Sequence, residues 1–194
     1  MCPVIHCRLS CVAPTSIPSG CRSTGLYELV KAGDYEQIAP GIYARSGALD
    51  DTTAGLASIA CRKPAATLCL LTALSLHDLT DEITRASDVA LPRGERALTT
   101  RFGLFRWHNF DRATFDLGRQ QHRLIEDITI GLYSPERTLT DVFRLRHEIG
   151  IDLANEALKR WLTRRTSKPA DLLGVARAFP QAFPALRNAL EILL

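Results

Sequence analysis

The sequence predicts an α+β protein in which a partial N-terminal winged helix precedes an α+β domain with a small sheet and several C-terminal helices. Three observations support this. A helix-like segment is followed closely by two β-prone runs, further β-prone runs lie in the middle of the chain, and helical periodicity dominates the end. We therefore divide the chain into an irregular lead-in at 1–22, a partial winged helix-turn-helix at 23–47 and a larger domain at 50–194.

The lead-in is expected to be irregular because it is rich in proline and shows no sustained helical period. Four of the six cysteines of the chain lie in it, but their spacing lacks the C-x2-C pairs of a zinc ribbon. It also lacks a positive region followed by an apolar core, which argues against a secretory signal. We expect unpaired thiols, no metal site and a cytoplasmic protein.

The next segment has the pattern of a helix and a hairpin. Ser23 can cap a helix that stops at Gly33, and Pro40-Gly41 suits the turn between two short strands. With the apolar side chains of this helix buried (Leu26, Leu29 and Val30), its polar side chains are free to contact phosphates or base edges of DNA: Ser23, Thr24, Tyr27 and Lys31. Arg45, just past the hairpin, is placed to contact the DNA backbone. The alternative is a surface helix and hairpin that pack on the larger domain, and the net charge of +3 is too small to decide.

SGALDDTTAG at 46–55 is expected to be the boundary between the two modules, and the larger domain to begin with helical material from about residue 53 and a buried helix from Pro64 to about Leu79. The apolar run AATLCLLTALSL in that helix is shorter than a membrane span requires, so we expect no membrane association. Strands are predicted at 87–91 and 104–110. A hairpin should pair HRLI with ITIGLY across Glu126-Asp127.

The rest of the chain is predicted to be helical. In SPERTLTDVFRLRHEIG, at 134–150, Ser134 can cap, Pro135 suits the first position and Gly150 suits the exit. One face carries Leu139, Val142 and Phe143, while other positions lie largely off that face: Arg137, Thr140, Asp141, Arg144 and Glu148.

Three further helices are expected. In DLANEALKRWLTRR the apolar residues form an unbroken stripe, and two helices follow at about 169–179 and 184–194. The basic segment RWLTRRTSKP at 160–169, at the end of the helix with the apolar stripe, is a second candidate binding patch. It contains Arg160, Arg164, Arg165 and Lys168. Cations at a helix C-terminus are also favoured by the helix dipole, which is the structural alternative.

The motifs of common enzymes are missing. The sequence contains no G-x-S-x-G, no phosphate loop, no G-x-G-x-x-G and no H-E-x-x-H, and none of its four lysines has an acidic residue two positions before it. His77 beside Asp78 has no obvious nucleophile near it, so a structural role at a helix end is the better prediction, and Cys69 is expected to be a small buried hydrophobe. We predict no catalytic residues and no cofactor.

Three motifs, in this order, resemble the AbiEi family of antitoxins from bacterial abortive-infection (type IV) toxin-antitoxin systems. LYELVKAGDYEQIAPGIYAR is similar to the family's recognition helix and wing, and TLCLLTALSLHDLT to its apolar helix that ends in a histidine. SPERTLTDVFRLRHEIGIDLANEAL carries the family's most recognisable element, the E-R-T-L-x-D core with Glu136, Arg137, Thr138, Leu139 and Asp141. Arg137 and Asp141 are spaced i, i+4 and Glu136 lies in the first turn, so they are expected to stabilise the helix, unless Arg137 reaches toward the sheet or a partner.

The resemblance implies a non-enzymatic antitoxin. Its C-terminal domain would counter a nucleotidyltransferase toxin, directly or indirectly, and its winged helix would bind operator DNA and repress the shared operon. The alternative hypothesis is a stand-alone winged-helix transcriptional regulator. Residues 1–22 are too short and too rich in proline to supply the helices that support the recognition helix in this family, so we expect weak operator binding by the chain as written.

Overall fold

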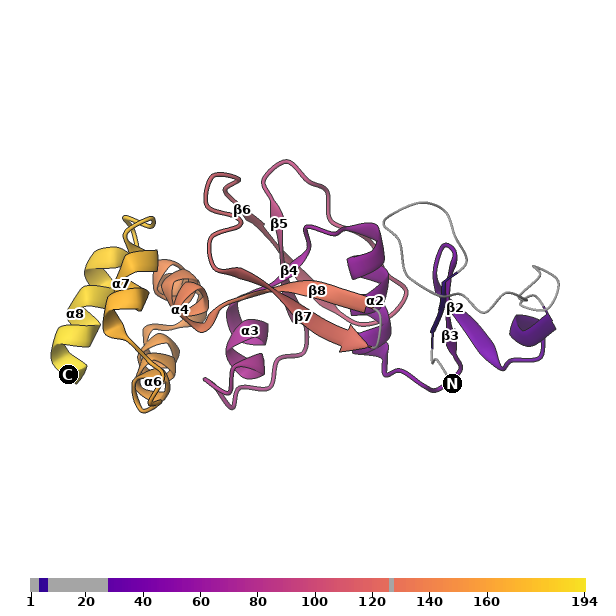
Figure 1. Ribbon diagram of the computed structural model, residues 1–194, viewed down its shortest axis with the longest axis horizontal. Coiled ribbons are helices and arrows are strands. Elements are labelled where there is room, and N and C mark those ends of the chain that lie inside the picture. The colour runs from indigo at the N-terminus through magenta and orange to yellow at the C-terminus, as the bar shows by residue number, and fades with distance from the viewer. Residues whose placement is uncertain (1–3, 7–27, 126–127) are drawn as a thin grey trace. The chain divides into compact units, whose positions relative to one another are not determined.

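The computed structural model describes residues 4–6, 28–125 and 128–194 of the chain. It confirms the α+β class, with two sheets and a set of C-terminal helices (Figure 1). The chain divides into two compact units, the first formed by described residues of 1–64, 98–104 and 123–130 and the second by 65–97, 105–122 and 131–194. Each unit is described by itself below.

The first unit contains a three-stranded antiparallel sheet with the order β1-β3-β2, formed by β1 (Val4–His6), β2 (Tyr35–Ala39) and β3 (Ile42–Arg45). Strand β1 corrects the prediction that the whole lead-in is irregular: it forms because its backbone pairs with β3, a partner distant in the sequence. The predicted hairpin is thus confirmed: β2 and β3 are joined at Pro40-Gly41, where Gly41 has a φ of 75° that suits a tight turn. Before it, residues 28–31 are helical, and Gly33 has a φ of 84°, as expected of a helix stop. The predicted start of this helix lies outside the described residues.

Helix α2 (Asp51–Arg62) also belongs to the first unit and contacts β2. It begins where the polar boundary segment was predicted to turn helical. The side chain of Asp50 caps it by accepting hydrogen bonds from the backbone N–H groups of Thr52 and Thr53, at 2.9 and 3.0 Å.

A five-stranded mixed sheet has the order β6-β5-β4-β8-β7. Its strands are β4 (Thr67–Leu68), β5 (Ser87–Pro92), β6 (Phe105–Phe110), β7 (Arg119–Ile125) and β8 (Ile128–Tyr133). The four predicted strands of the larger domain are confirmed, although β7 begins three residues earlier than expected. Strand β4 was not predicted: it pairs with both β5 and β8 and occupies the centre of the sheet.

The helix predicted from Pro64 to Leu79 is therefore wrong in its first half. Helix α3 spans only Leu70–Leu76, because the preceding apolar residues form β4. A run of buried apolar residues does not distinguish a strand from a helix by its periodicity, which explains the error. The second half, including the helix end at His77, is as predicted.

The segment 134–150 forms two helices, α4 (Pro135–Arg144) and α5 (Arg146–Ile149), instead of the single helix expected. Its predicted ends are correct, since the Ser134 hydroxyl accepts a hydrogen bond from the N–H of Arg137 and Gly150 ends α5 with a φ of 104°. Helix α4 contacts α3, α5 and the three C-terminal helices α6 (Ile151–Leu162), α7 (Pro169–Ala176) and α8 (Phe183–Leu193).

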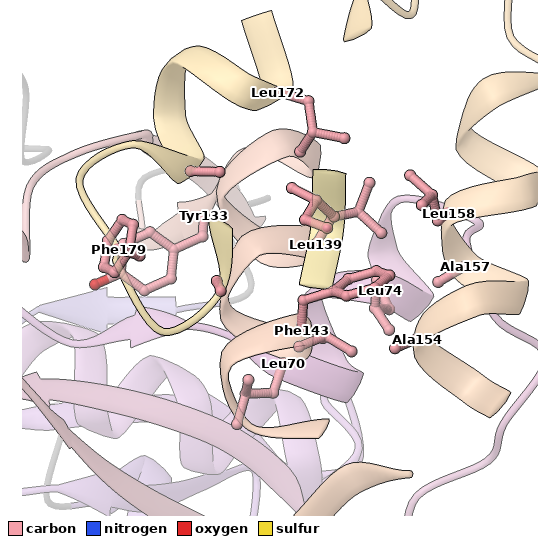
Figure 2. Close-up of a cluster of buried hydrophobic side chains, with 14 of the residues drawn as sticks. Leu70, Leu74, Tyr133, Leu139, Phe143, Ala154, Ala157, Leu158, Leu172 and Phe179 are labelled. Atoms are coloured by element: carbon pink, nitrogen blue, oxygen red, sulfur yellow. The ribbon is translucent and has the colours of Figure 1, made fainter. Parts of the chain in front are cut away.

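The core of the second unit is built around α4. Figure 2 shows Leu139 and Phe143 of this helix beside Leu74 of α3 and toward Ala154, Ala157 and Leu158 of α6. Four residues of the predicted apolar stripe of α6 are buried, namely Ala154, Ala157, Leu158 and Trp161, while Leu153 and Leu162 are half-buried. None of the helices in the described part of the chain has the length and apolar character that crossing a bilayer requires.

Candidate functional site

The exposed face of the N-terminal hairpin carries polar and aromatic side chains. The register pairs Tyr35 with Arg45 and Gln37 with Tyr43, so these four side chains share one face of the hairpin. Gln37 and Arg45 are exposed and the two tyrosines are half-buried. Strand alternation could have identified this set, but only Arg45 was predicted from the sequence. The remaining hairpin positions include the buried residues Ile38, Ala39, Ile42 and Ala44.

Backbone hydrogen bonds at Asp34 link the helical segment to the end of the hairpin. The N–H of Asp34 donates to the carbonyl of Leu29 at 3.0 Å, and the carbonyl of Asp34 accepts from the N–H of Ser46 at 2.9 Å. Lys31 and Arg45 are both exposed, and each lies within a few residues of a residue in these hydrogen bonds. The other predicted DNA-contacting residues, Ser23, Thr24 and Tyr27, lie outside the described residues.

The signature residues of α4 are buried, which corrects the prediction that Arg137, Thr140 and Asp141 lie off the buried face. Seven consecutive residues of this helix, from Arg137 to Phe143, are buried. The prediction failed because it assumed one buried face, whereas α4 is covered by several helices at once. Glu136 in the first turn is half-buried, and Thr138 donates a hydrogen bond to the Tyr133 carbonyl at 3.2 Å.

Arg137 pairs with Asp141 within the helix, as the spacing predicted, and also reaches a loop instead of the sheet. Its Nε donates to Asp141 Oδ2 at 2.8 Å within the helix, and its Nη1 donates to the carbonyls of Thr114 and Leu117, the latter at 2.8 Å. The guanidinium thereby ties α4 to the loop between β6 and β7. A buried charge is tolerated when such partners surround it, and removing one partner leaves the other charge uncompensated.

Asp141 lies between two guanidinium groups. Arg144 Nη2 is 2.9 Å from Asp141 Oδ1, which makes this contact an ion pair. Burial raises the pKa of Asp141, and the charges of Arg137 and Arg144 oppose that rise.

Aromatic rings enclose the Arg137 guanidinium. Its Cζ lies 4.4 Å from the ring centroids of both Tyr133 and Phe179, a cation–π geometry. The Nη2 atom of Arg137 is buried from water and has no hydrogen-bond partner among the described residues. Gly118 makes this close packing possible: it has a φ of 72°, and a Cβ there would lie 2.7 Å from Arg137 Cβ. No local sequence signal identifies these distant neighbours.

His77 has a structural position, as predicted. Its Nε2 lies 2.7 Å from the carbonyl oxygen of Tyr133, and its own carbonyl accepts a hydrogen bond from Arg164. Burial lowers the pKa of His77. Nε2 donates to Tyr133, because a carbonyl oxygen can only accept. Cys69 is fully buried, as expected.

The basic patch at 160–168 is partly used within the fold. Arg160 forms ion pairs with Asp81 at 2.5 Å and Glu156 at 3.2 Å, and Arg164 bonds His77. Arg165 and Lys168 are exposed. Among residues 4–6, 28–125 and 128–194, no three His, Cys, Asp or Glu side chains are arranged to hold a metal ion.

No protein-family model matches the sequence, and no curated protein matches it. Among solved structures, the chain is similar to the crystal structure of the RV2827C protein from Mycobacterium tuberculosis, with 17% sequence identity and a TM-score of 0.48. The similarity covers 88% of this chain and 68% of that chain. At this identity and TM-score it carries no information about function.

Proposed function

We propose that the chain is an antitoxin-like protein of a bacterial toxin-antitoxin system that counters a nucleotidyltransferase toxin and represses its own operon by binding DNA. The resemblance of the three motifs to AbiEi antitoxins is the source of this proposal. The exposed hairpin face with Tyr35, Gln37, Tyr43 and Arg45 is the observation that carries its DNA-binding part.

The hairpin face suits the backbone of DNA. Arg45 can form a charge-assisted hydrogen bond to phosphate, while Gln37 and the tyrosine hydroxyls can donate to phosphate or sugar oxygens. Lys31 adds a second exposed cation at the end of the helical segment. Contacts of this kind position a protein on DNA and make its affinity fall with salt.

Because they are buried, Arg137 and Asp141 of the E-R-T-L-x-D core have a structural role in α4. Arg137 and Asp141 are not available to a partner, because both are fully buried. Under our proposal they hold α4 at the centre of the domain, and the toxin-directed surface lies on other residues of the second unit.

Two measurements test this proposal. Co-expression with a nucleotidyltransferase encoded in the neighbouring gene should restore growth, and continued growth arrest with folded protein present would contradict the antitoxin role. Gel-shift titrations of the full chain on the upstream intergenic DNA should show binding that weakens with salt. Absence of binding at low salt would contradict autorepression.

The alternative proposal is a stand-alone transcriptional regulator. The same hairpin face supports it, because a stand-alone regulator would use that face to contact DNA in the same way. DNA binding without any effect on a neighbouring toxin would favour this alternative.

A further inference from the structure

Strand β6 forms one edge of the five-stranded sheet and, among the described strands, pairs only with β5. The carbonyl of Phe110 accepts a hydrogen bond from the N–H of Arg93, just after β5, at 2.7 Å. In a parallel pair, a residue whose carbonyl bonds the neighbouring strand also directs its N–H to that strand, and the pattern repeats at every second residue. Arg106, His108 and Phe110 therefore direct their backbone groups toward β5.

The alternate residues of β6 direct their backbone groups away from the sheet. These residues are Phe105, Trp107 and Asn109, and each offers an N–H donor and a carbonyl acceptor along the edge. In the part of the chain that the structure describes, no group bonds to these donors and acceptors. Because they are spaced as in a strand, an extended chain placed alongside can bond all of them in order.

The composition of β6 also favours pairing with another strand. The rings of Phe105 and Trp107 lie on one face with their centroids 6.5 Å apart, and the strand contains no proline, glycine or lysine. Proteins commonly protect an exposed edge with proline, with lysine or with a very short strand. The strand at the other edge, β7, begins Arg-Gln-Gln-His-Arg, a polar sequence that is less suited to pairing.

The charges beside this edge favour an acidic partner. The side chain of Arg106 is 62% exposed, whereas that of Asp88, its neighbour at 3.8 Å, is 2% exposed and bonds His108 more closely, at 2.9 Å. A strand that approaches from solvent therefore meets the guanidinium before the carboxylate. Arg112, exposed just after β6, adds a second cation that forms no ion pair with another described residue. Opposite charges on paired strands attract each other.

A second copy of this chain fits the edge less well. Antiparallel pairing of β6 with itself, centred on Trp107, places Arg106 of each copy opposite His108 of the other. An arginine is always charged and a histidine is charged when protonated, so this pair offers repulsion and no attraction. A register centred on Arg106 or on His108 places two identical side chains of this kind opposite each other.

We propose that the β6 edge binds an extended, acidic segment of another protein as a sixth strand of the sheet. Backbone hydrogen bonds to Phe105, Trp107 and Asn109 would hold the segment. Its specificity would come from alternation, with acidic side chains facing Arg106 and apolar side chains facing Trp107. This surface lies in the second unit and does not depend on the function proposed above.

Amide hydrogen exchange of the full chain, followed by NMR, tests the edge. The probe is a capped hexapeptide of alternating valine and glutamate. Without the peptide, the amides of His108 and Phe110 should exchange slowly, and those of Trp107 and Asn109 should exchange quickly. The peptide at about ten times its Kd should slow exchange at Trp107 and Asn109 about tenfold, because exchange then occurs from the free protein only. A hexapeptide of alternating valine and lysine should leave both amides unprotected.

Two substitutions at one position separate the backbone from the side chain. Asn109→Pro removes an N–H that points away from β5, so the β5–β6 pairing should persist while the edge is blocked, and the peptide should bind at least about tenfold more weakly. Asn109→Ala is the matched control, since it keeps the N–H and should bind as the wild type does. A peptide methylated at every amide nitrogen makes the same test on the unchanged protein and should not bind.

Protection of Trp107 and Asn109 by the glutamate peptide, lost in Asn109→Pro and kept in Asn109→Ala, supports the proposal. Unchanged fast exchange with the peptide, equal protection by the lysine peptide, binding of the methylated peptide, or equal binding by folded forms of both variants would overturn it. Slow exchange at Trp107 and Asn109 that becomes faster when the free protein is diluted would also overturn it, in favour of a second copy at this edge.

Discussion

At the scale of single residues, the main feature is a buried arginine that its neighbours hold in place. Arg137 bonds Asp141, two loop carbonyls and two aromatic rings at once. Buried ion pairs of this kind contribute little net stability compared with apolar residues of the same size, but removing one partner strongly destabilises the fold. Arg137 and Asp141 therefore fix one arrangement of α4, β8 and the 111–118 loop.

Replacing Arg137 with Met should lower the free energy of unfolding by about 3–5 kcal/mol, because the loop carbonyls and one Asp141 oxygen lose their donor. Arg187→Met, which breaks the exposed pair with Glu191, should change it by less than about 1 kcal/mol. Urea denaturation of both variants gives the comparison. Similar losses in the two would show that Arg137 is not a central contact.

Gly118 should tolerate alanine less well than Gly47 does. Both have a φ of 72°, so both substitutions strain the backbone by about 1 kcal/mol. Only at Gly118 would the new Cβ meet Arg137, so Gly118→Ala should lose roughly 1–3 kcal/mol more. Equal thermal shifts for the two variants would mean that α4 moves aside without cost.

His77 should make stability depend on pH. Its pKa is lowered by burial, so the unfolded chain binds a proton more readily than the folded one below the ordinary value of 6.5. The contribution of neutral His77 is present above that pH and is lost as the pH falls toward the folded pKa. Urea midpoints at about pH 7.5 and 5.5 should therefore differ more in the wild type than in His77→Gln. Identical differences would exclude a titrating role.

At the scale of elements, the features predicted correctly are those that depend on residues close together in the sequence. The Pro40-Gly41 turn, the Ser134 cap and the stripe of α6 depend on residues a few positions apart, and each was predicted correctly. Strand β4 and the buried face of α4 depend on residues far away in the sequence. Thr67 and Leu68 become a strand because β5 and β8 lie on either side, and no pattern within the segment records that.

The α6 stripe should be a stabilising face. Leu158 is fully buried in the core around α4, so Leu158→Ala should lower the free energy of unfolding by about 2–5 kcal/mol through a cavity. Ile151→Ala on the same helix is the control, since Ile151 is 45% exposed and should change it by less than about 1 kcal/mol. A chemical melt in which both variants match the wild type would show that α6 does not pack as described.

At the scale of the whole molecule, the candidate sites fall on separate units of the chain. The hairpin with Lys31 and Arg45 belongs to the first unit, while helix α4 with Arg137 and Asp141 belongs to the second. The hairpin and the helix that carries the E-R-T-L-x-D core were both predicted from local patterns in the sequence. The ion pairs of Asp88 with Arg106 and His108 were not predicted, because they form only when parallel pairing brings β5 beside β6.

This separation predicts that the two parts of the proposed function can be lost independently. The double variant Lys31→Ala, Arg45→Ala removes two exposed cations without touching the second unit, so it should keep its fold and its ability to relieve toxicity. Its operator affinity should fall uniformly across DNA sequences, and the slope of log affinity against log salt should decrease by about 2, one for each lost phosphate contact. Gel-shift titrations at several salt concentrations measure the slope, and co-expression with the toxin measures relief. A variant that binds DNA as the wild type does would remove the hairpin from the DNA interface. One that binds DNA weakly and also fails to relieve toxicity would show that the two activities depend on the same surface.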